Sequence, residues 1–355
     1  MKSVIKETMQ GVFSGGKVIV AGSEADAPAK GDGRRRGRLE LEEAAGLLET
    51  DKIVIKDEEG KEMSPDEFLK RALAISPEFG LRYLVYNDLK ERGYVVQPGG
   101  VDFWLYPRGV KPGEKPARYF IRILSGSDTI SLKELVELLV LARNMRKAPI
   151  IAVVDEESDI TYYEVKDAKF ENSETRKDEL KIKVKASLFG DRVVLWDADL
   201  AETLYRTYFY GNLTTEKRLL LSFLEAAFLM RKGMLEMAVA PQLSTLNSQP
   251  FERFIEYAST IETDFRAKYA VYADLMEKGQ MVKTGFKFGS HFRVYKAMQL
   301  KHSLYLVHVL SEEHVFPLPE LSRAVRLAHG VRKRMIFAFT VADGIRYVDV
   351  GRMKL

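Results

Sequence analysis

Side chains able to do acid-base chemistry near neutral pH are gathered at the C-terminal end of this sequence. Its five histidines all lie between positions 291 and 329, and they are His291, His302, His308, His314 and His329. Histidine is the side chain whose ordinary pKa lies closest to neutrality. The sequence has no cysteine, which excludes thiol nucleophiles, disulfides and cysteine-ligated zinc. Any histidine-based site is therefore expected near the C-terminal end.

Positive charge is concentrated in the same region. The whole chain has a net charge of +4, but residues 266–355 carry 16 lysines and arginines against 7 acidic residues, whereas the preceding residues carry 39 against 44. A basic cluster, Arg332-Lys333-Arg334, closes an expected helix, where cations also complement the helix dipole. An anionic partner is therefore expected at this end of the chain.

The elements that must position these residues occur twice. The segment YLVYNDLKERGYVV at 83–96 matches YAVYADLMEKGQMV at 269–282, and the offset is 186 positions. The same offset relates LVLARNMRK, which ends at Lys147, to VRLAHGVRK, which ends at Lys333. Because two separate segments share one spacing, the sequence predicts a tandem duplication.

The hydrophobic pattern of the second copy predicts a small mixed sheet that carries helices. Expected elements are a helix over 269–276 stopped by Gly279, paired extended segments over 281–295, a buried strand from 303, a helix over 318–333, and strands over 335–341 and 345–350. The fold class is therefore α/β (α+β), with a tandem duplication in which each half has a small helical or mixed N-terminal subdomain and a mixed-sheet subdomain.

The expected domain boundaries follow from the repeat and from two segments that interrupt it. The predicted subdomains span 1–80, 81–168, 187–262 and 263–355, and the charged stretch 169–186 is the expected linker. The segment from Gly22 to Arg38 is an expected surface insertion, because it is rich in Gly, Ala and Arg. No apolar run approaches the roughly 18 residues of a membrane span, and the start MKSVIKETMQ lacks the features of a secretory signal, so a cytoplasmic protein is expected.

Three segments of the second copy resemble the catalytic domain of the archaeal tRNA-splicing endonucleases. They are VKTGFKFGSHFRVY from Val282 to Tyr295, HSLYLVHVL from His302, and RLAHGVRKRM from Arg326. The resemblance implies an enzyme that excises introns from precursor tRNA by cutting at bulge-helix-bulge sites. The duplication resembles the subclass in which each chain holds a degenerate and an active unit and two chains form a homodimer.

The resemblance implies an active site made of Tyr295, His302 and Lys333. Cleaving RNA without a metal requires a base for the 2′-hydroxyl proton, an acid for the departing 5′-oxygen, and a cation for the charge on phosphorus. Histidine suits the acid, and a tyrosine, whose ordinary pKa is about 10, becomes a base if nearby cations stabilise the phenolate. Lys333 would stabilise the developing negative charge. The expected products carry a 2′,3′-cyclic phosphate and a 5′-hydroxyl, and neither a metal nor another cofactor is expected.

The first copy aligns as a degenerate version of this site. Pro116 falls opposite His302, whereas Tyr106 and Lys147 fall opposite the catalytic tyrosine and lysine. The first copy therefore lacks the general acid and is expected to serve as a scaffold.

The resemblance also implies residues for assembly and for RNA binding. An acidic loop, with Asp155, Glu156 and Glu157, is expected to dock into a basic groove of the partner chain and so to form the homodimer. Two arginines are expected to hold a flipped-out base of the RNA bulge between their planes. Arg326 matches the first of them, and the second is Arg352, with Arg346 as the alternative.

Two other functions compete with this interpretation. A metal-dependent nuclease of the restriction-enzyme type needs an acidic-x-Lys motif, and none occurs from Ser187 onward. A non-catalytic RNA-binding or structural subunit is disfavoured because all three catalytic residue types are present in the second copy. The remaining histidines are interpreted as structural or, for His291 and His314, as solvent-exposed loop residues.

Overall fold

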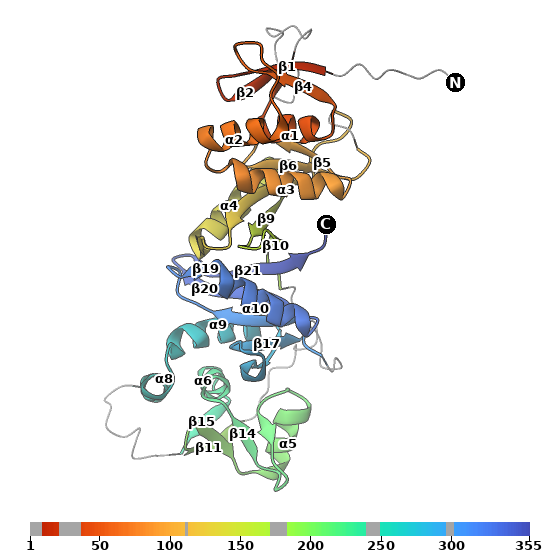
Figure 1. Cartoon of the computed structure of the whole chain (residues 1–355). Coiled ribbons are helices and arrows are strands. Elements are labelled where there is room, and N and C mark those ends of the chain that lie inside the picture. Colours follow the sequence, from red (N-terminus) through yellow and green to blue (C-terminus); the bar gives the residue numbers. More distant parts are fainter. Residues whose placement is uncertain (1–8, 21–36, 111–112, 171–182, 239–248, 296–301) are drawn as a thin grey trace.

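The structure, a computed structural model, describes residues 9–20, 37–110, 113–170, 183–238, 249–295 and 302–355. Figure 1 shows an elongated molecule with the N-terminal subdomain of the first copy at one end and that of the second copy at the other. The two mixed-sheet subdomains lie between them and are joined edge to edge. The duplication expected from the sequence is therefore visible in the fold.

The N-terminal subdomain of the first copy is a small sheet covered by two helices. Its elements are β1 (Met9–Ser14), β2 (Lys17–Val20), β3 (Arg38–Leu39), β4 (Ile53–Lys56), α1 (Leu41–Glu49) and α2 (Pro65–Ile75). The strand order is β3-β2-β1-β4, with β1 and β4 parallel. Residues 21–36 of the expected insertion lie outside the described residues, and its last residue, Arg38, begins β3.

The N-terminal subdomain of the second copy repeats this arrangement with one additional helix, α5 (Ala198–Arg206), and one additional strand, β13 (Asn212–Leu213), among the described residues. Its other elements are β11 (Val184–Phe189), β12 (Arg192–Leu195), β14 (Leu219–Leu221), α6 (Phe223–Arg231), β15 (Leu235–Met237) and α8 (Pro250–Ile261). Strand β11 begins at Val184, inside the segment expected to be the linker. Residues 171–182 of that segment lie outside the described residues.

The two mixed-sheet subdomains have the same order of elements. The first contains α3 (Phe79–Glu91), β5 (Val95–Pro98), β6 (Phe103–Tyr106), β7 (Tyr119–Ser125), β8 (Thr129–Ser131), α4 (Leu132–Met145), β9 (Ala148–Val154) and β10 (Ile160–Asp167). The second contains α9 (Phe265–Glu277), β16 (Met281–Thr284), the 3-10 helix η2 (Phe286–Phe288), β17 (Phe292–Tyr295), β18 (Tyr305–Val309), β19 (Val315–Pro317), α10 (Leu318–Gly330), β20 (Arg334–Val341) and β21 (Gly344–Met353).

These subdomains share one ten-stranded sheet with approximate internal two-fold symmetry. The order is β16-β17-β18-β20-β21-β10-β9-β7-β6-β5, and the halves meet where β10 and β21 pair antiparallel. A second pairing joins β8 to β19. There the amide of Leu132 donates to the carbonyl of His314 (3.0 Å), and the amide of Leu318 donates to the carbonyl of Asp128 (3.1 Å). Each donor and each acceptor has its counterpart 186 positions away, so equivalent segments of the two copies face each other.

Two equivalent helices, α4 and α10, pack on the sheet beside this junction. Helix α4 begins at a capping box, in which Ser131 Oγ accepts the amide of Glu134. Helix α10 ends at Gly330, three residues before the expected end at Lys333, because Arg332 adopts a left-handed conformation (φ 57°) that turns the chain. Helix α4, with 14 residues, is the longest described helix, and none of the described helices is long and apolar enough to cross a bilayer.

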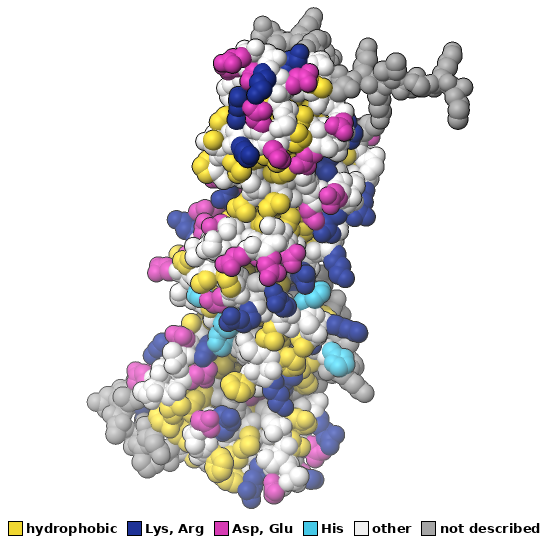
Figure 2. Space-filling model, viewed as in Figure 1, with side chains coloured by type: hydrophobic (Ala, Val, Ile, Leu, Met, Phe, Trp, Pro, Cys, Tyr) yellow, Lys and Arg dark blue, Asp and Glu magenta, His cyan; other side chains and the backbone are white. Residues whose placement is uncertain are grey.

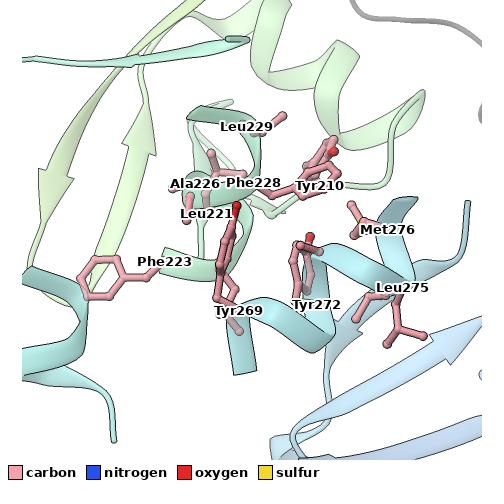
Figure 3. Close-up of a cluster of buried hydrophobic side chains, with 14 of the residues drawn as sticks. Tyr210, Leu221, Phe223, Ala226, Phe228, Leu229, Tyr269, Tyr272, Leu275 and Met276 are labelled. Atoms are coloured by element: carbon pink, nitrogen blue, oxygen red, sulfur yellow. The ribbon is translucent and has the colours of Figure 1, made fainter. Parts of the chain in front are cut away.

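The largest buried core of the second copy ties its two subdomains together. Figure 3 shows side chains of α6, Phe228 among them, facing Tyr269 and Tyr272 of α9, whereas the Phe223 ring points away from these tyrosines. The rings of Phe228 and Tyr272 meet edge to face with centroids 6.0 Å apart. The same core continues onto the α9 face of β16, β17 and β18. Burial of these aromatic side chains therefore fixes the N-terminal subdomain against the sheet that carries the candidate site.

Candidate active site

Tyr295 and Lys333 lie where three neighbouring strands begin or end, along one edge of the sheet. We call this row of strand ends the site edge. Val294 pairs with Tyr305 across β17 and β18, and the amide of Leu304 donates to the carbonyl of Val294 (2.9 Å), so Tyr295 is level with Leu304. Tyr305 pairs with Arg334 across β18 and β20, which places Lys333 level with Leu304 from the other side. Strands lie about 4.8 Å apart, so the α-carbons of the tyrosine and the lysine are roughly 10 Å apart.

The alternation of side chains places Tyr295 and Lys333 on the same face of the sheet. Leu306 and Met335 belong to the core beneath α10, so even-numbered residues of β18 and odd-numbered residues at the start of β20 face that helix. Lys333 is two residues before Met335 and therefore faces α10 as well. Tyr295 shares the face of Arg293, which pairs with Leu306. The site is therefore an edge of the sheet on its α10 side.

The Tyr295 side chain is buried (7% exposed) between two subdomains. Its ring meets Phe209, from the N-terminal subdomain of the second copy, edge to face with centroids 5.4 Å apart. The guanidinium of Arg293, two residues earlier on β17, lies 5.9 Å from the centre of the tyrosine ring. A guanidinium over an aromatic ring at this distance makes a cation-π contact.

The backbone of Lys333 is fixed by the turn that ends α10. The amide of Lys333 donates to the carbonyl of Ala328 (2.9 Å), and that of Arg332 donates to His329 (2.9 Å), which is the hydrogen-bond pattern of a Schellman motif. The lysine ammonium lies 5.4 Å from the centre of the Phe288 ring. It also donates a hydrogen bond to the carbonyl oxygen of Val331 (3.4 Å). The chain turn and the aromatic ring together hold the cation at the sheet edge.

His302 lies in the short segment that precedes β18, and its side chain is exposed. It is two residues before Leu304, which occupies the position between the tyrosine and the lysine. In Figure 2 histidine side chains are visible among lysines and arginines at the level of α10. An exposed imidazole beside this row can exchange protons with a ligand bound at the edge.

The structure separates the two candidates for the second RNA-clamping arginine. The antiparallel register of β20 and β21 pairs Met335 with Val350, so Arg352 is level with Lys333 at the site edge. Arg346 pairs with Phe339, near the opposite end of these strands. Arg326 is exposed on the C-terminal half of α10, the helix that covers the site face. Arg326 and Arg352 are thus both near the site edge, whereas Arg346 is distant from it.

The interpretation of His291 and His314 as solvent-exposed loop residues is wrong. His291 Nδ1 accepts the amide of Val309 (2.8 Å), and its ring packs on His308 with centroids 4.5 Å apart. Desolvation by burial, together with the neighbouring His308 and Lys268, lowers the pKa of His291 from 6.5 to about 4. His314 packs against Phe316 (4.4 Å between ring centroids) and lies 3.4 Å from a Glu320 carboxylate oxygen. Among the described residues, no three His, Asp or Glu side chains are grouped to hold a metal ion.

The first copy contains counterparts of Tyr295 and Lys333 but not of His302. Tyr106 ends β6, and its hydroxyl donates to Gln97 Oε1 (2.6 Å). Lys147 follows a left-handed Arg146 (φ 53°), and its ammonium lies 5.1 Å from the centre of the Trp104 ring. Pro116 is exposed at the position that corresponds to His302.

The acidic loop lies in the hairpin between β9 and β10. Glu156 and Glu157 are exposed. Asp155 has a different role within the loop, because its carboxylate accepts the amides of Glu157 (3.0 Å) and Asp159 (2.9 Å). Asp155 therefore shapes the turn that presents the two glutamates.

Sequence reasoning missed the contribution of the turn between β16 and β17. Residues 285–291 connect these strands, whereas only residues 99–102 connect β5 and β6 in the first copy. The longer turn supplies Phe288, which contacts the Lys333 ammonium and the Arg293 guanidinium. The signal was present, because the offset between the copies changes from 186 to 189 at this turn.

A cavity of about 430 Å³ lies between the other face of this turn and the N-terminal subdomain. Its lining includes Lys268, Lys283 and His291. The ammonium of Lys283 lies 3.5 Å from a Glu225 carboxylate oxygen, and that of Lys268 lies 3.0 Å from Glu262. Both lysines thus already carry ion pairs within the chain.

Comparison with known proteins agrees with the duplication, because two family models each match the chain twice. The model of the tRNA intron endonuclease catalytic C-terminal domain matches residues 79–162 and 265–347, and the model of the N-terminal domain matches residues 9–69 and 184–245. The tRNA-splicing endonuclease of Methanococcoides burtonii is 42% identical over 321 residues, which cover 89% of this chain and 90% of the relative. That of Methanosarcina mazei is 42% identical over 353 residues (96% and 98%), and that of Haloferax volcanii is 33% identical over 372 residues (97% and 99%).

Proposed function

Because the chain belongs to the tRNA intron endonuclease family, we propose that it excises introns from precursor tRNA by cutting at bulge-helix-bulge sites. One observation carries the proposal: the register of β17, β18, β20 and β21 aligns Tyr295, Lys333 and Arg352 along one edge and one face of the sheet. The exposed His302 lies beside this row. A phosphodiester placed along the edge would meet a phenol, an imidazole and an ammonium.

The cleavage is a transesterification within the RNA. Tyr295 takes the proton of the 2′-hydroxyl, and the resulting oxygen attacks the adjacent phosphorus. The bond from phosphorus to the 5′-oxygen breaks, and His302 protonates the leaving oxygen. Lys333 stabilises the negative charge that develops on the phosphate oxygens. The products are a 2′,3′-cyclic phosphate and a 5′-hydroxyl, so the step needs neither water nor a metal.

The surroundings of each group support these roles. The guanidinium of Arg293 lies 5.9 Å from the centre of the Tyr295 ring, so a cation is adjacent to the proposed base. His302 is exposed, so its imidazole can regain a proton from solvent after each turnover. Arg326 and Arg352 are the proposed pair that holds a bulge base, since a guanidinium plane can stack on an unpaired base.

We further propose a homodimer in which the exposed pair Glu156 and Glu157 meets a basic surface of the partner chain. The uneven charge of the chain supports this arrangement, because the C-terminal ninety residues are basic and the rest is acidic. The proposed location is the cytoplasm.

The test is cleavage of an intron-containing precursor tRNA, able to form a bulge-helix-bulge, in excess EDTA. End-group analysis should find a 2′,3′-cyclic phosphate and a 5′-hydroxyl. His302→Ala should abolish cutting and keep binding, which separates an enzyme from a binding subunit. Strict dependence on magnesium would instead favour a metal-dependent nuclease and overturn the mechanism.

A further inference from the structure

The degenerate copy carries an additional cation at the edge that corresponds to the active site. The amide of Arg118 donates to the carbonyl of Leu105 (3.0 Å), so Arg118 is level with Tyr106, the residue after Leu105. The amide of Ala148 donates to the carbonyl of Arg118 (3.1 Å), which places Arg118 level with Lys147. Arg118 thus occupies the position that Leu304 holds in the second copy. The row consists of a tyrosine, an arginine and a lysine, where the active copy has a tyrosine, a leucine and a lysine.

Aromatic rings hold the cations of this edge in place. The ammonium of Lys147 lies 5.1 Å from the centre of the Trp104 ring, and the guanidinium of Arg118 lies 5.2 Å from that of Tyr119. Gly100, at φ +74°, lies so close to the Trp104 ring that an added Cβ would approach it to 2.7 Å. Trp104 is therefore packed by the turn before it, and it positions the lysine.

The two segments that form this edge contain more basic than acidic residues. Arg118 and Arg146 are exposed. Residues 103–120 contain four basic residues and one acidic residue, Glu114. Residues 140–150 contain three basic residues and no acidic residue. An exposed arginine beside a lysine fixed on an aromatic ring suits a phosphate group.

We propose that this edge, formed by Arg118, Arg146 and Lys147, binds a phosphodiester of the RNA backbone without cutting it. The inference rests on the proposed function, since it takes the substrate to be RNA. At this edge Lys147 corresponds to the lysine of the active copy, and Arg118 is an additional cation. Pro116 stands at the position of the general acid. The proline at the position of the general acid has no side-chain proton to donate, so we assign the edge as a holding site.

Binding of uncleaved precursor tRNA by full-length His302→Ala protein tests the proposal. In that background Arg118→Leu copies the residue of the active copy, so it removes the cation with a side chain that the fold accepts at the equivalent position. The dissociation constant should rise about tenfold, which is typical when one charge-assisted hydrogen bond is removed. The slope of log K against log salt should fall by about 0.7 to 0.9 for each phosphate that the protein no longer neutralises.

Controls separate the possible outcomes. Lys70→Leu removes one exposed charge from α2, far from this edge, and should leave both the slope and the affinity unchanged; Arg118→Lys should restore the slope. If Arg118→Leu lowers the thermal midpoint, Arg146→Gln gives the same test at an exposed position. The inference would be overturned if the salt dependence of binding were unchanged in both Arg118→Leu and Arg146→Gln. It would also be overturned if these variants changed the sedimentation of the protein but not the salt dependence of binding. Failure of the unmodified chain to cut precursor tRNA would count against the proposed function alone, because the binding comparison does not depend on cleavage.

Discussion

The ring of Phe288 contacts both Lys333 and Arg293, with the ammonium at 5.4 Å and the guanidinium at 5.6 Å from its centre. One aromatic side chain thus positions the proposed transition-state cation and the cation beside Tyr295. Phe288→Ala should lower the cleavage rate at saturating RNA about fivefold, since a cation-π contact contributes about 1 kcal/mol. Single-turnover kinetics on precursor tRNA would measure the change.

Conservative variants show whether the aromatic ring itself matters. Phe288→Tyr should keep most of the rate, and Phe288→Leu should lose as much as the alanine variant, with little change in KM. Phe189, an exposed aromatic residue (58%) at the end of β11, is the matched control, and Phe189→Ala should leave the rate unchanged. A leucine variant as fast as the unmodified chain would show that the ring does not position the cations.

The opposite ends of β21 provide a matched pair of arginines. Arg352→Ala should weaken binding of a bulge-containing RNA about tenfold, because loss of stacking on one base costs about 1–3 kcal/mol. Arg346→Ala removes the same side chain from the same strand and face, far from the site edge, and should have no effect. Equal losses in the two variants would contradict the assignment of Arg352 to the base clamp.

The buried His291 should make folding stability depend on pH. Burial lowers its pKa to about 4, whereas in the unfolded chain the group titrates near 6.5. Between these values the unfolded state binds more protons, so stability should fall as the pH drops from about 6.5 toward 4. Urea unfolding at several pH values would measure this. His291→Asn keeps an acceptor for the Val309 amide and should flatten the dependence, and an unchanged slope would assign the effect to other groups.

Charge reversal tests the proposed dimer contact most cleanly at two of the three acidic residues. Asp155 shapes the loop through its hydrogen bonds. Its replacement would therefore alter the conformation of the loop as well as any contact with the partner chain. Glu156→Lys with Glu157→Lys should shift the chain from dimer to monomer in sedimentation at moderate salt. Reversal of Glu312 and Glu313, an exposed pair in another turn, should not. A dimer that survives the first change would rule out this loop as the contact.

Much of the fold could be predicted because the repeat supplied the same pattern twice. The helix that ends before Gly279, the hairpin of β20 and β21 and the strand β18 are present in the structure. The end of α10 was less predictable, because the left-handed turn falls on Arg332, a residue with a side chain, where glycine is the usual signal. The start of β11 was hidden within a charged stretch that has the composition of a linker.

The sequence motifs supplied the proposed residues of the site but not their arrangement. Tyr295, His302 and Lys333 followed from the motifs, whereas their common edge depends on strand register, which a single sequence does not reveal. The choice between Arg352 and Arg346 depends on the same register. His291 could not be recognised as buried, because its burial comes from contacts with β18 rather than from its own segment.

The reciprocal pairing of β8 with β19 and of β10 with β21 has a consequence for how the protein is made. Each half offers its neighbour the same edge, so separately synthesised halves would compete to pair with copies of themselves. Carrying both on one polypeptide removes that competition. Every molecule leaves the ribosome with one copy of each half, and no balance between two gene products is required.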